Sequence, residues 1–254
     1  MITAGIDVGS ISTKGALVDR GKLVAAKVIA TGYNARRAAE EVFEALVSGA
    51  GRHASDVTRV VATGYGRNSV GFADRTVTEI TCHAAGAHFA DPTVRCVIDI
   101  GGQDSKAIAM DDRGRVRDFV MNDKCAAGTG RFLEVMARAL EVDLDAFGAM
   151  ALAADRPAAI SSLCTVFAES EVISLIARGE ARANIIAGIH DAIASRVAAM
   201  ARRVGVDPPV MMTGGVALNP GVVRSLERQL GHAVRVTAQA QVNGAVGAAL
   251  LAAG

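Results

Sequence analysis

An internal repeat constrains the fold of this chain more than any other feature of its sequence. The stretch IDVGSISTKGALVDRGK, which begins at Ile6, aligns nearly residue for residue with IDIGGQDSKAIAMDDRG, which begins at Ile98. In both copies an apolar run ends in Asp-x-Gly, a lysine opens a second apolar run, and a charged glycine turn follows. A repeat of this length does not arise easily by accident, so the chain is expected to contain a duplicated strand-turn-strand unit.

Short apolar runs alternate with helical patterns along the whole chain. Strands are predicted over residues 2–8, 14–19, 23–30, 57–62, 94–100, 106–110, 116–121 and 210–213. Helices are predicted over 35–47, 80–90, 132–140, 166–177 and 181–204, with another from about residue 220, because apolar residues recur there at helical spacing. This order of elements predicts an α/β fold class.

Composition and charge exclude several classes of protein. The 254 residues are 51% hydrophobic, which is enough for a sizeable core. The 27 basic and 26 acidic side chains are scattered, so neither nucleic acid nor a membrane is expected as a partner. Gly5, Asp7, Lys14 and Asp19 interrupt the N-terminal apolar stretch, which therefore resembles neither a membrane span nor a signal peptide. A cytoplasmic location is expected, in which the four cysteines stay reduced.

The two glycine turns carry the residue types that a phosphate site needs. Glycine lets the backbone approach a phosphate, the N–H groups of the turn can donate to its oxygens, and an aspartate at the strand end can hold Mg²⁺. Asp7 and Asp99 stand at that strand end in the two copies. A third element follows the strand predicted at 210–213, where Gly214 and Gly215 allow a flat ring to lie against backbone and Asn219 precedes a helix. Together the three elements predict a nucleotide cleft.

These elements resemble those of a known superfamily. DVGSISTK, DIGGQDSK and TGGVALN are similar to the two phosphate elements and the adenosine element of the acetate kinase/sugar kinase/Hsp70/actin superfamily of ATPases. The resemblance implies an actin-like ATPase fold of two duplicated ribonuclease-H-like subdomains around a nucleotide cleft. Residues 1–92 would form the first subdomain and residues 93–240 the second, which would also carry the cluster cysteines. The final helix, at about 241–254, would pack back onto the first subdomain.

Two cysteine contexts narrow the resemblance to one branch. MNDKCAAGTGRFLE and SSLCTVFAESEVISL resemble the BadF/BadG/BcrA/BcrD-type iron–sulfur ATPases, the activators (component A) of 2-hydroxyacyl-CoA dehydratases, which are related to the ATPase subunits of benzoyl-CoA reductases. Family members are homodimers that share one [4Fe–4S] cluster, and the matching ligand positions here are Cys125 and Cys164. Neither residue belongs to a close pair such as Cys-x-x-Cys, and two chains together would supply the four thiolates of such a cluster.

The resemblance also implies roles around ATP or ADP and Mg²⁺. Asp7 and Asp99 would organise Mg²⁺, and Gln103 or Asp104 would position the attacking water as the catalytic residue. The other cofactor-binding positions lie in the three elements: Gly9, Ser10, Ser12, Thr13, Lys14, Gly101, Gly102, Gln103, Lys106, Gly214, Gly215 and Asn219. Reduced ferredoxin or flavodoxin would supply an electron, and ATP hydrolysis would drive it onto a 2-hydroxyacyl-CoA dehydratase in anaerobic metabolism.

Two alternatives stay open. An ATPase subunit held in a benzoyl-CoA-reductase-type complex would share these motifs, and nothing in the chain separates it from a dissociable activator. A small-molecule kinase of the same fold is the other alternative, although the short chain leaves little room for a separate substrate domain and a kinase would not need the two cysteine contexts. For an activator, the acyl-CoA substrate belongs to the partner enzyme, so no residue of this chain specifies it.

The other two cysteines and the five histidines are not expected to take part in the chemistry. Cys96 lies inside an apolar run and is expected to be a small core residue, and Cys82 is interpreted as structural or left without a role. The five histidines show no metal-ligand spacing and are expected at the surface or as helix caps. Lys14 and Lys106 occupy matching places in the repeat, which favours a role near phosphate over a solvated strand position.

Overall fold

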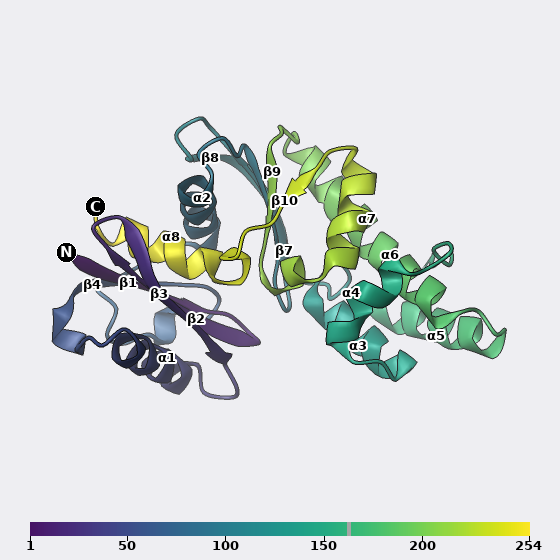
Figure 1. Ribbon diagram of the computed structural model, residues 1–254, viewed down its shortest axis with the longest axis horizontal. Coiled ribbons are helices and arrows are strands. Elements are labelled where there is room, and N and C mark those ends of the chain that lie inside the picture. The colour runs from purple at the N-terminus through teal and green to yellow at the C-terminus, as the bar shows by residue number, and fades with distance from the viewer. Residues whose placement is uncertain (162–163) are drawn as a thin grey trace.

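Two five-stranded mixed sheets built on one plan form the two lobes of the molecule (Figure 1). The computed structural model describes residues 1–161 and 164–254. The first sheet contains β1 (Ile2–Val8), β2 (Ser12–Asp19), β3 (Lys22–Ala30), β4 (Val57–Thr63) and β5 (Arg75–Thr76). The second contains β6 (Cys96–Ile100), β7 (Ser105–Met110), β8 (Val116–Asn122), β9 (Val210–Thr213) and β10 (Val234–Arg235). Their strand orders are β3-β2-β1-β4-β5 and β8-β7-β6-β9-β10, so the duplication extends to the whole sheet and the predicted α/β class is confirmed.

Helices cover both faces of the first sheet. On one face lies α1 (Ala35–Gly49), which begins where the Asn34 side chain accepts a hydrogen bond from the Arg37 N–H at 3.1 Å. Its apolar stripe of Ala39, Val42 and Leu46 is buried against the sheet. The other face is covered by α8 (Asn243–Leu251), which contacts β1, β2 and β4 although it ends the chain.

The second sheet is also sandwiched between helices. On one face α2 (Glu79–Ala90) contacts β6, β7 and β8, and on the other lies the longest helix, α6 (Arg182–Arg203). The latter buries Ile189, Ile193 and Val197 in the largest core of the molecule. Beside it packs α7 (Pro220–Leu230), which ends at Gly231 in the left-handed conformation that glycine adopts readily.

Two helices, α2 and α8, lie against each other between the lobes (Figure 1). They approach closely because small residues face one another: a Cβ at Gly247 would stand 1.8 Å from the Cys82 carbonyl oxygen, and one at Gly86 would stand 2.3 Å from the Asn243 carbonyl oxygen. Since α2 touches both α8 and the second sheet, it belongs to neither lobe alone. The predicted division between residues 92 and 93 therefore stays a prediction.

Three further helices extend the second lobe around α6. They are α3 (Gly130–Leu140), α4 (Leu144–Leu152) and α5 (Thr165–Ala177), and α3 packs against both of the others. The sequence pattern does not predict α4, because the helix buries only Phe147 and Gly148 and a central glycine lowers helix propensity. Of the sequence motif around the second cluster cysteine, Ser162 and Leu163 lie outside the described residues.

Two short edge strands also escape sequence prediction. Each of β5 and β10 has only two residues and pairs with one neighbour, so neither produces an alternating pattern. The predicted strand at 94–100 begins two residues later, at Cys96. No helix in residues 1–161 or 164–254 is long and apolar enough to cross a membrane.

Candidate functional site

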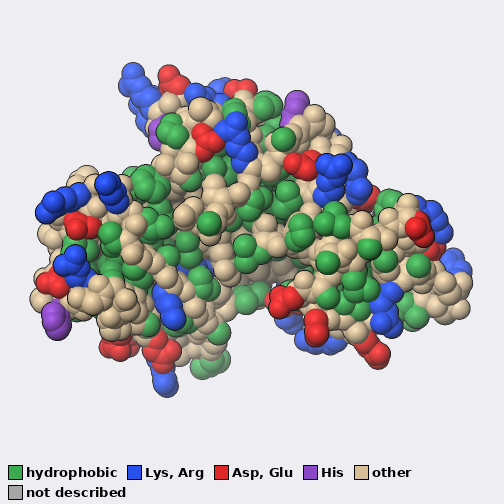
Figure 2. Space-filling view, in the orientation of Figure 1, with side chains coloured by type: hydrophobic (Ala, Val, Ile, Leu, Met, Phe, Trp, Pro, Cys, Tyr) green, Lys and Arg blue, Asp and Glu red, His purple; other side chains and the backbone are tan. Residues whose placement is uncertain are grey.

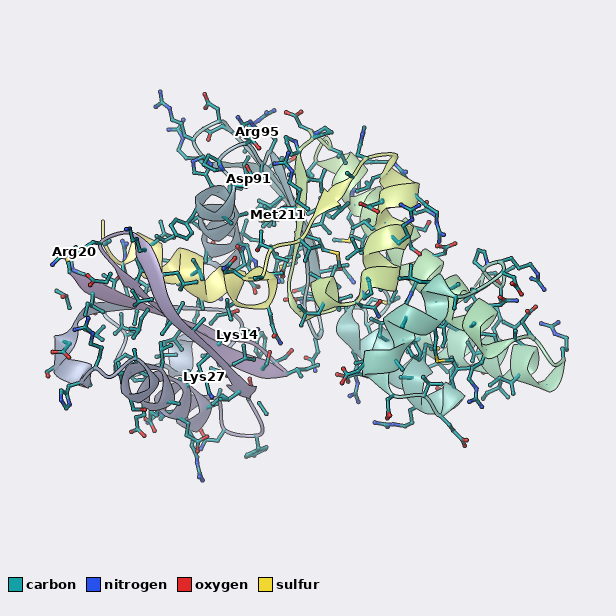
Figure 3. The ribbon with its side chains drawn as sticks, in the orientation of Figure 1. Lys14, Arg20, Lys27, Asp91, Arg95 and Met211 are labelled. Atoms are coloured by element: carbon teal, nitrogen blue, oxygen red, sulfur yellow. The ribbon has the colours of Figure 1, made fainter. Side chains whose placement is uncertain are left out.

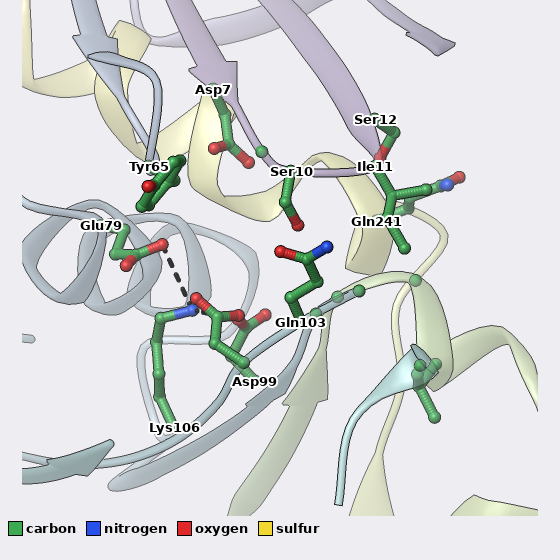
Figure 4. A pocket seen from close by; sticks show the side chains of 18 of the residues that line it. Asp7, Ser10, Ile11, Ser12, Tyr65, Glu79, Asp99, Gln103, Lys106 and Gln241 are labelled. Carbon is green, nitrogen blue, oxygen red and sulfur yellow. Dashed lines mark hydrogen bonds and ion pairs between the residues drawn. The ribbon is translucent and has the colours of Figure 1, made fainter. Parts of the chain in front are cut away.

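A cleft of about 550 Å³ lies between the two lobes, and residues from both repeats line it. The outline of the molecule is indented between the lobes (Figure 2), and Lys14 reaches from the first lobe toward the second (Figure 3). The lining includes most of the residues singled out from the sequence: Asp7, Gly9, Ser10, Ser12, Lys14, Asp99, Gly101, Gly102, Gln103, Asp104, Lys106, Gly214 and Gly215. Figure 4 shows the side chains of the two turns facing each other.

Strand register places the two copies of the motif in equivalent positions. In the first sheet Asp7 of β1 pairs with Lys14 of β2, and in the second Asp99 of β6 pairs with Lys106 of β7. Each turn is closed by one backbone hydrogen bond between its ends, of 3.1 Å in the first copy and 2.9 Å in the second. Adjacent strand ends therefore present one carboxylate and one ammonium group from each lobe.

The parallel neighbours of β1 and β6 complete the equivalence. Thr63 of β4 pairs with Asp7, and Thr213 of β9 pairs with Asp99. A glycine with positive φ follows each threonine, at +86° for Gly64 and at +88° for Gly214. A Cβ at Gly64 would stand 2.4 Å from Asp7 Oδ1, and one at Gly214 would stand 2.9 Å from Asp99 Oδ1. Glycine is required at both positions because the chain turns there directly beside a carboxylate.

Backbone N–H groups in the two turns remain available to a ligand. The Gly9 and Gly101 N–H groups close their own turns, so they are committed. Those of Ser10, Gly102 and Gln103 donate to no acceptor among the described residues. Consecutive free N–H groups in a tight turn form an anion-binding concavity. The structure thus offers the amides next to the closing glycines for a phosphate group.

The second carboxylate is buried in a network of charges. Lys106 Nζ lies 3.2 Å from Asp99 Oδ2, 2.9 Å from Asp104 Oδ1 and 3.2 Å from Glu79 Oε2, and the lysine is only 1% exposed. Burial alone would lower the pKa of Lys106, but the surrounding carboxylates outweigh it and raise that pKa. Burial would likewise raise the pKa of Asp99, but the neighbouring His83 and Lys106 side chains together with hydrogen bonding hold it well below the usual range.

The first carboxylate has a simpler environment. Asp7 Oδ2 lies 3.3 Å from Lys14 Nζ, and no second ion pair to Asp7 occurs within the described residues. Glu79 reaches the cleft from the start of α2, and burial raises its pKa. The dashed line in Figure 4 marks its ion pair with Lys106.

The donor set at the bottom of the cleft fits Mg²⁺. Among the described residues, the ion pairs around the two turns join four carboxylates to two lysines: Asp7, Glu79, Asp99 and Asp104 to Lys14 and Lys106. Carboxylate and water oxygens are the ligands that Mg²⁺ prefers, and the metal is commonly held by one or two carboxylates together with substrate phosphates. Asp7 and Asp99 enter from opposite lobes beside the free turn amides, so they are suited to hold a metal that a phosphate also contacts.

The second turn is attached directly to α3. The Gly130 N–H donates to the Gly101 carbonyl at 2.9 Å, and the Arg131 N–H donates to the Gly102 carbonyl at 2.8 Å. Two of the first N–H groups of a helix, which lack partners within the helix, are thus satisfied by the turn. The cleft lining also includes Lys124, which directly precedes Cys125 in the chain.

The four cysteines fall into two classes. Cys82 and Cys96 are fully buried, and burial raises the pKa of each thiol to about 12, in agreement with a structural role. Cys125 is half-buried and Cys164, the residue that precedes α5, is exposed. No group of three or more potential metal ligands occurs in the part of the chain that the structure describes.

Two predicted site residues lie outside the cleft lining. The Thr13 hydroxyl is buried and lies 2.8 Å from the Thr31 hydroxyl. The Asn219 carbonyl oxygen of the side chain accepts from the Gly221 and Val222 N–H groups, at 3.0 and 3.2 Å, and so caps α7. Asn219 Nδ2 lies 3.3 Å from His190 Nε2. Both side chains support segments that lead to the cleft.

Among the lining residues that reasoning from the sequence misses are Tyr65, Glu79, His83 and Gln241. One signal was present for Tyr65, because Thr63-Gly64 before it matches Thr213-Gly214 of the third element. No motif or residue spacing in the sequence predicts Glu79 or His83, which belong to a helix between the two repeats. The expectation that the histidines lie at the surface or cap helices is wrong for His83 and His190, which are buried at 6% and 0% exposure.

Comparison with known proteins agrees with the geometry. Residues 4–252 match the model of the BadF/BadG/BcrA/BcrD ATPase family. An activator of lactoyl-CoA dehydratase from Anaerotignum propionicum is 52% identical over 99% of this chain and 97% of its own length. The crystal structure of Acidaminococcus fermentans (R)-2-hydroxyglutaryl-CoA dehydratase component A superposes with a TM-score of 0.96 at 47% identity, over 99% of this chain and 97% of that one.

Two more relatives bear on the ligand and on the alternatives. The activator of 2-hydroxyisocaproyl-CoA dehydratase from Clostridium difficile, solved with bound ADPNP, has a TM-score of 0.94 at 44% identity and covers 99% of this chain and 94% of its own. One of the subunits of benzoyl-CoA reductase from Thauera aromatica is 38% identical over 90% of this chain and 83% of its own length. The chain is therefore more similar to the dehydratase activators than to this reductase component.

Proposed function

The chain belongs to the BadF/BadG/BcrA/BcrD ATPase family, and on that premise we propose that it is the ATP-driven, one-electron activator of a 2-hydroxyacyl-CoA dehydratase. Its ATPase activity follows from the family and from the close relatives named as activating ATPases. The single observation that carries the rest of the proposal is the direct attachment of the second phosphate turn to α3, the helix that follows Cys125.

The ATP site of this proposal is the cleft between the lobes. The free turn amides of Ser10, Gly102 and Gln103 donate to phosphate oxygens, and Asp7 and Asp99 hold Mg²⁺, which neutralises charge on the transferring phosphoryl group. The adenosine lies along Gly214 and Gly215. Gln103 or Asp104 positions the attacking water; Asp104 is already paired with Lys106, which favours Gln103 for contact with a water.

The electron carrier of this proposal is one [4Fe–4S] cluster held by two copies of the chain. Such a cluster supplies one-electron chemistry and needs four thiolates. Cys125 and Cys164 are the only cysteines of the described chain that are not fully buried, so one chain supplies two and a second copy supplies the others.

Exposed apolar side chains support a homodimer at this end of the molecule. On α5, directly after Cys164, Val166 and Phe167 are each 67% exposed, and Ile173 and Ile176 are also exposed. Apolar side chains gathered on one exposed helix are typical of surfaces that another protein covers. A second copy is the occupant we infer, because the thiolate count is incomplete without it.

In this proposal, hydrogen bonds within the chain couple the nucleotide site to the cluster. A phosphate bound by the second turn acts on the carbonyls of Gly101 and Gly102, and these hold the first N–H groups of α3. Nucleotide can change the reduction potential only as far as it binds one arrangement more tightly than another. A tenfold difference in nucleotide affinity between the two arrangements corresponds to a shift of about 59 mV in a one-electron reduction potential. Reduced ferredoxin or flavodoxin is the electron donor, and the dehydratase is the acceptor.

The first experiment is a metal and sulfide analysis of protein purified without oxygen. We expect about four iron and four sulfide per two chains, in a species with the mass of a dimer. Cys125→Ser and Cys164→Ser should each lose the iron. Cys96→Ala is the matched control, because that cysteine is buried and should not contribute. Iron-free wild type, or iron that survives both serine substitutions, would contradict the cluster.

The partner is tested by activation of purified dehydratases. Lactoyl-CoA, 2-hydroxyglutaryl-CoA and 2-hydroxyisocaproyl-CoA dehydratases are suitable first acceptors, because close relatives of this chain are named for them. We expect the reduced protein to switch on at least one of them only when ATP and Mg²⁺ are present. If the chain instead co-purifies with fixed subunits and reduces an aromatic acyl-CoA, the benzoyl-CoA-reductase-type alternative is correct.

A further inference from the structure

We propose that His83 is a positioning residue that holds the carboxylates of Asp99 and Asp7 in register across the cleft. The inference rests on the Mg²⁺–nucleotide site of the proposed function, and it does not depend on the iron–sulfur cluster. His83 stands on α2, between the lobes, and its side chain is more than nine-tenths buried although it lines the cleft.

One ring nitrogen of His83 faces the second carboxylate. Nδ1 lies 3.2 Å from Thr213 Oγ1 and 3.3 Å from Asp99 Oδ1. The Thr213 hydroxyl in turn donates to Asp99 Oδ1 at 2.9 Å, so its oxygen is free to accept from Nδ1–H. A proton on Nδ1 satisfies both oxygens, whereas a lone pair there would face a carboxylate. We therefore assign the Nδ1–H form of the ring.

A second helix anchors the backbone of His83. Asn243, at the start of α8, donates from Nδ2 to the His83 carbonyl oxygen at 2.9 Å. The residue is thus tied to α8 through its carbonyl and to β9 through its ring. Since α8 also packs on the first sheet, this contact ties the second carboxylate to the first lobe.

The other ring nitrogen faces the first carboxylate across Gly244. A Cβ on residue 244 would stand 2.9 Å from His83 Nε2 and 3.1 Å from Asp7 Oδ2, so both atoms border the same small space. In the Nδ1–H form, Nε2 accepts hydrogen bonds, as does the Asp7 carboxylate. One water that donates a proton to each joins them, which is a common role for water between two acceptors.

This arrangement gives His83 a definite effect on metal binding. Residues that orient metal ligands through hydrogen bonds typically change metal affinity about 10-fold to 100-fold when they are replaced. His83 orients Asp99 through Nδ1 and Asp7 through the water at Nε2, so its removal should weaken binding of Mg²⁺ with nucleotide. Nucleotide without metal should be affected much less, because His83 lies beside the carboxylates and not beside the free turn amides.

The test compares ADP affinity with and without Mg²⁺, measured by competition with a fluorescent ADP analogue. For His83→Ala we expect affinity with Mg²⁺ to fall about 10-fold or more and affinity without Mg²⁺ to change less than about threefold. Asparagine can place an amide N–H near the position of Nδ1, so His83→Asn should recover most of the loss. His88→Asn, on the same helix but outside the cleft lining, is the matched control.

Gly244→Ala tests the Nε2 side separately. Its methyl group would stand 2.9 Å from Nε2 and 3.1 Å from Asp7 Oδ2, so it would crowd both atoms and exclude the water, and we expect a loss of about threefold to tenfold, again only with Mg²⁺. This variant also decides the matter if His83→Ala fails to fold. An equal loss of affinity with and without Mg²⁺, or no loss in His83→Ala and Gly244→Ala, would overturn the inference. Wild type that binds ADP without any dependence on Mg²⁺ would overturn the proposed site itself.

Discussion

The two copies of the repeat present the same pair of residues in different surroundings. Asp99 is paired with Lys106 in a buried cluster that also includes Asp104 and Glu79, and Thr213 donates to it. Asp7 has a single ion pair, with Lys14. Identical strand register in the two sheets therefore does not produce identical electrostatics. The difference arises because Glu79 of α2 and Thr213 of β9 make direct polar contacts with the second copy.

The supports of the two turns differ as well. The first turn is held by the segment after β3, where the Thr31 hydroxyl donates to the Gly9 carbonyl at 2.7 Å and the Thr31 N–H donates to the Ile11 carbonyl at 2.9 Å. The second is held by the N-terminus of α3. One copy of the motif is thus joined to a local loop and the other to a helix that leads away from the cleft. The two turns are thus alike in themselves and differ in the segments that support them.

The largest expected difference between the copies lies in the two lysines. Lys106→Met leaves the buried Asp99 carboxylate and the partly buried Glu79 and Asp104 carboxylates without their shared cation, and breaking such a network costs about 3–5 kcal/mol in the free energy of unfolding. Lys14→Met leaves only one carboxylate, that of Asp7, without its cation and should cost less, about 2 kcal/mol. Urea unfolding followed by circular dichroism, without nucleotide, measures both values. Similar losses in the two variants would show that the copies are electrostatically alike.

A second pair of variants should affect catalysis equally and stability unequally. Asp7→Asn and Asp99→Asn each remove a proposed metal ligand, so ATP turnover should fall about 100-fold or more in both. Only Asp99→Asn should also lower the unfolding free energy, because only Asp99 balances a fully buried lysine. Steady-state phosphate release with Mg²⁺, together with the urea measurement, checks this prediction. Full turnover in either variant would remove that carboxylate from the metal site.

The second lobe should also be the more sensitive to acid. Burial lowers the pKa of His190 from its ordinary value of 6.5 to about 4. Above pH 6.5 the ring is neutral in both states; as pH falls toward 4 only the unfolded chain takes up a proton, and about 2–3 kcal/mol of stability is lost. His190→Gln should remove this part of the pH dependence.

The smallest difference is expected at the equivalent threonines. The Thr213 hydroxyl donates to a buried carboxylate, so Thr213→Val should cost about 1.5–2 kcal/mol in unfolding free energy. Thr63 Oγ1 is buried and has no hydrogen-bond partner in the described part of the chain, so Thr63→Val should change stability by about 0.5 kcal/mol or less. The two variants have the same shape as threonine and differ only in the lost hydroxyl. Equal costs would mean that Thr63 has a partner after all.

The local sequence was sufficient to predict those cleft residues that lie in a turn or directly beside it. The Asp-x-Gly repeat predicted which residues of β1, β2, β6 and β7 line the cleft, because strand alternation and a tight turn determine where neighbouring side chains point. The same reasoning placed the glycine pair after β9. For Thr13 and Asn219 it identified the right segments, but those side chains bond within their own lobes.

Tertiary structure decided which distant residues meet at those turns. Glu79 and His83 precede the second turn by many residues and carry no motif. They reach Lys106 and Asp99, respectively, only because α2 crosses between the lobes and packs on α8. The burial that sets the pKa of Lys106 and of His190 is likewise invisible in the chain, since it depends on what covers each side chain after folding. The sequence by itself determined the phosphate turns and the strands that present them, because those depend on local geometry. Only the packed molecule decided the charge balance between the two carboxylates, because electrostatic energy depends on distance through space and on exclusion of water.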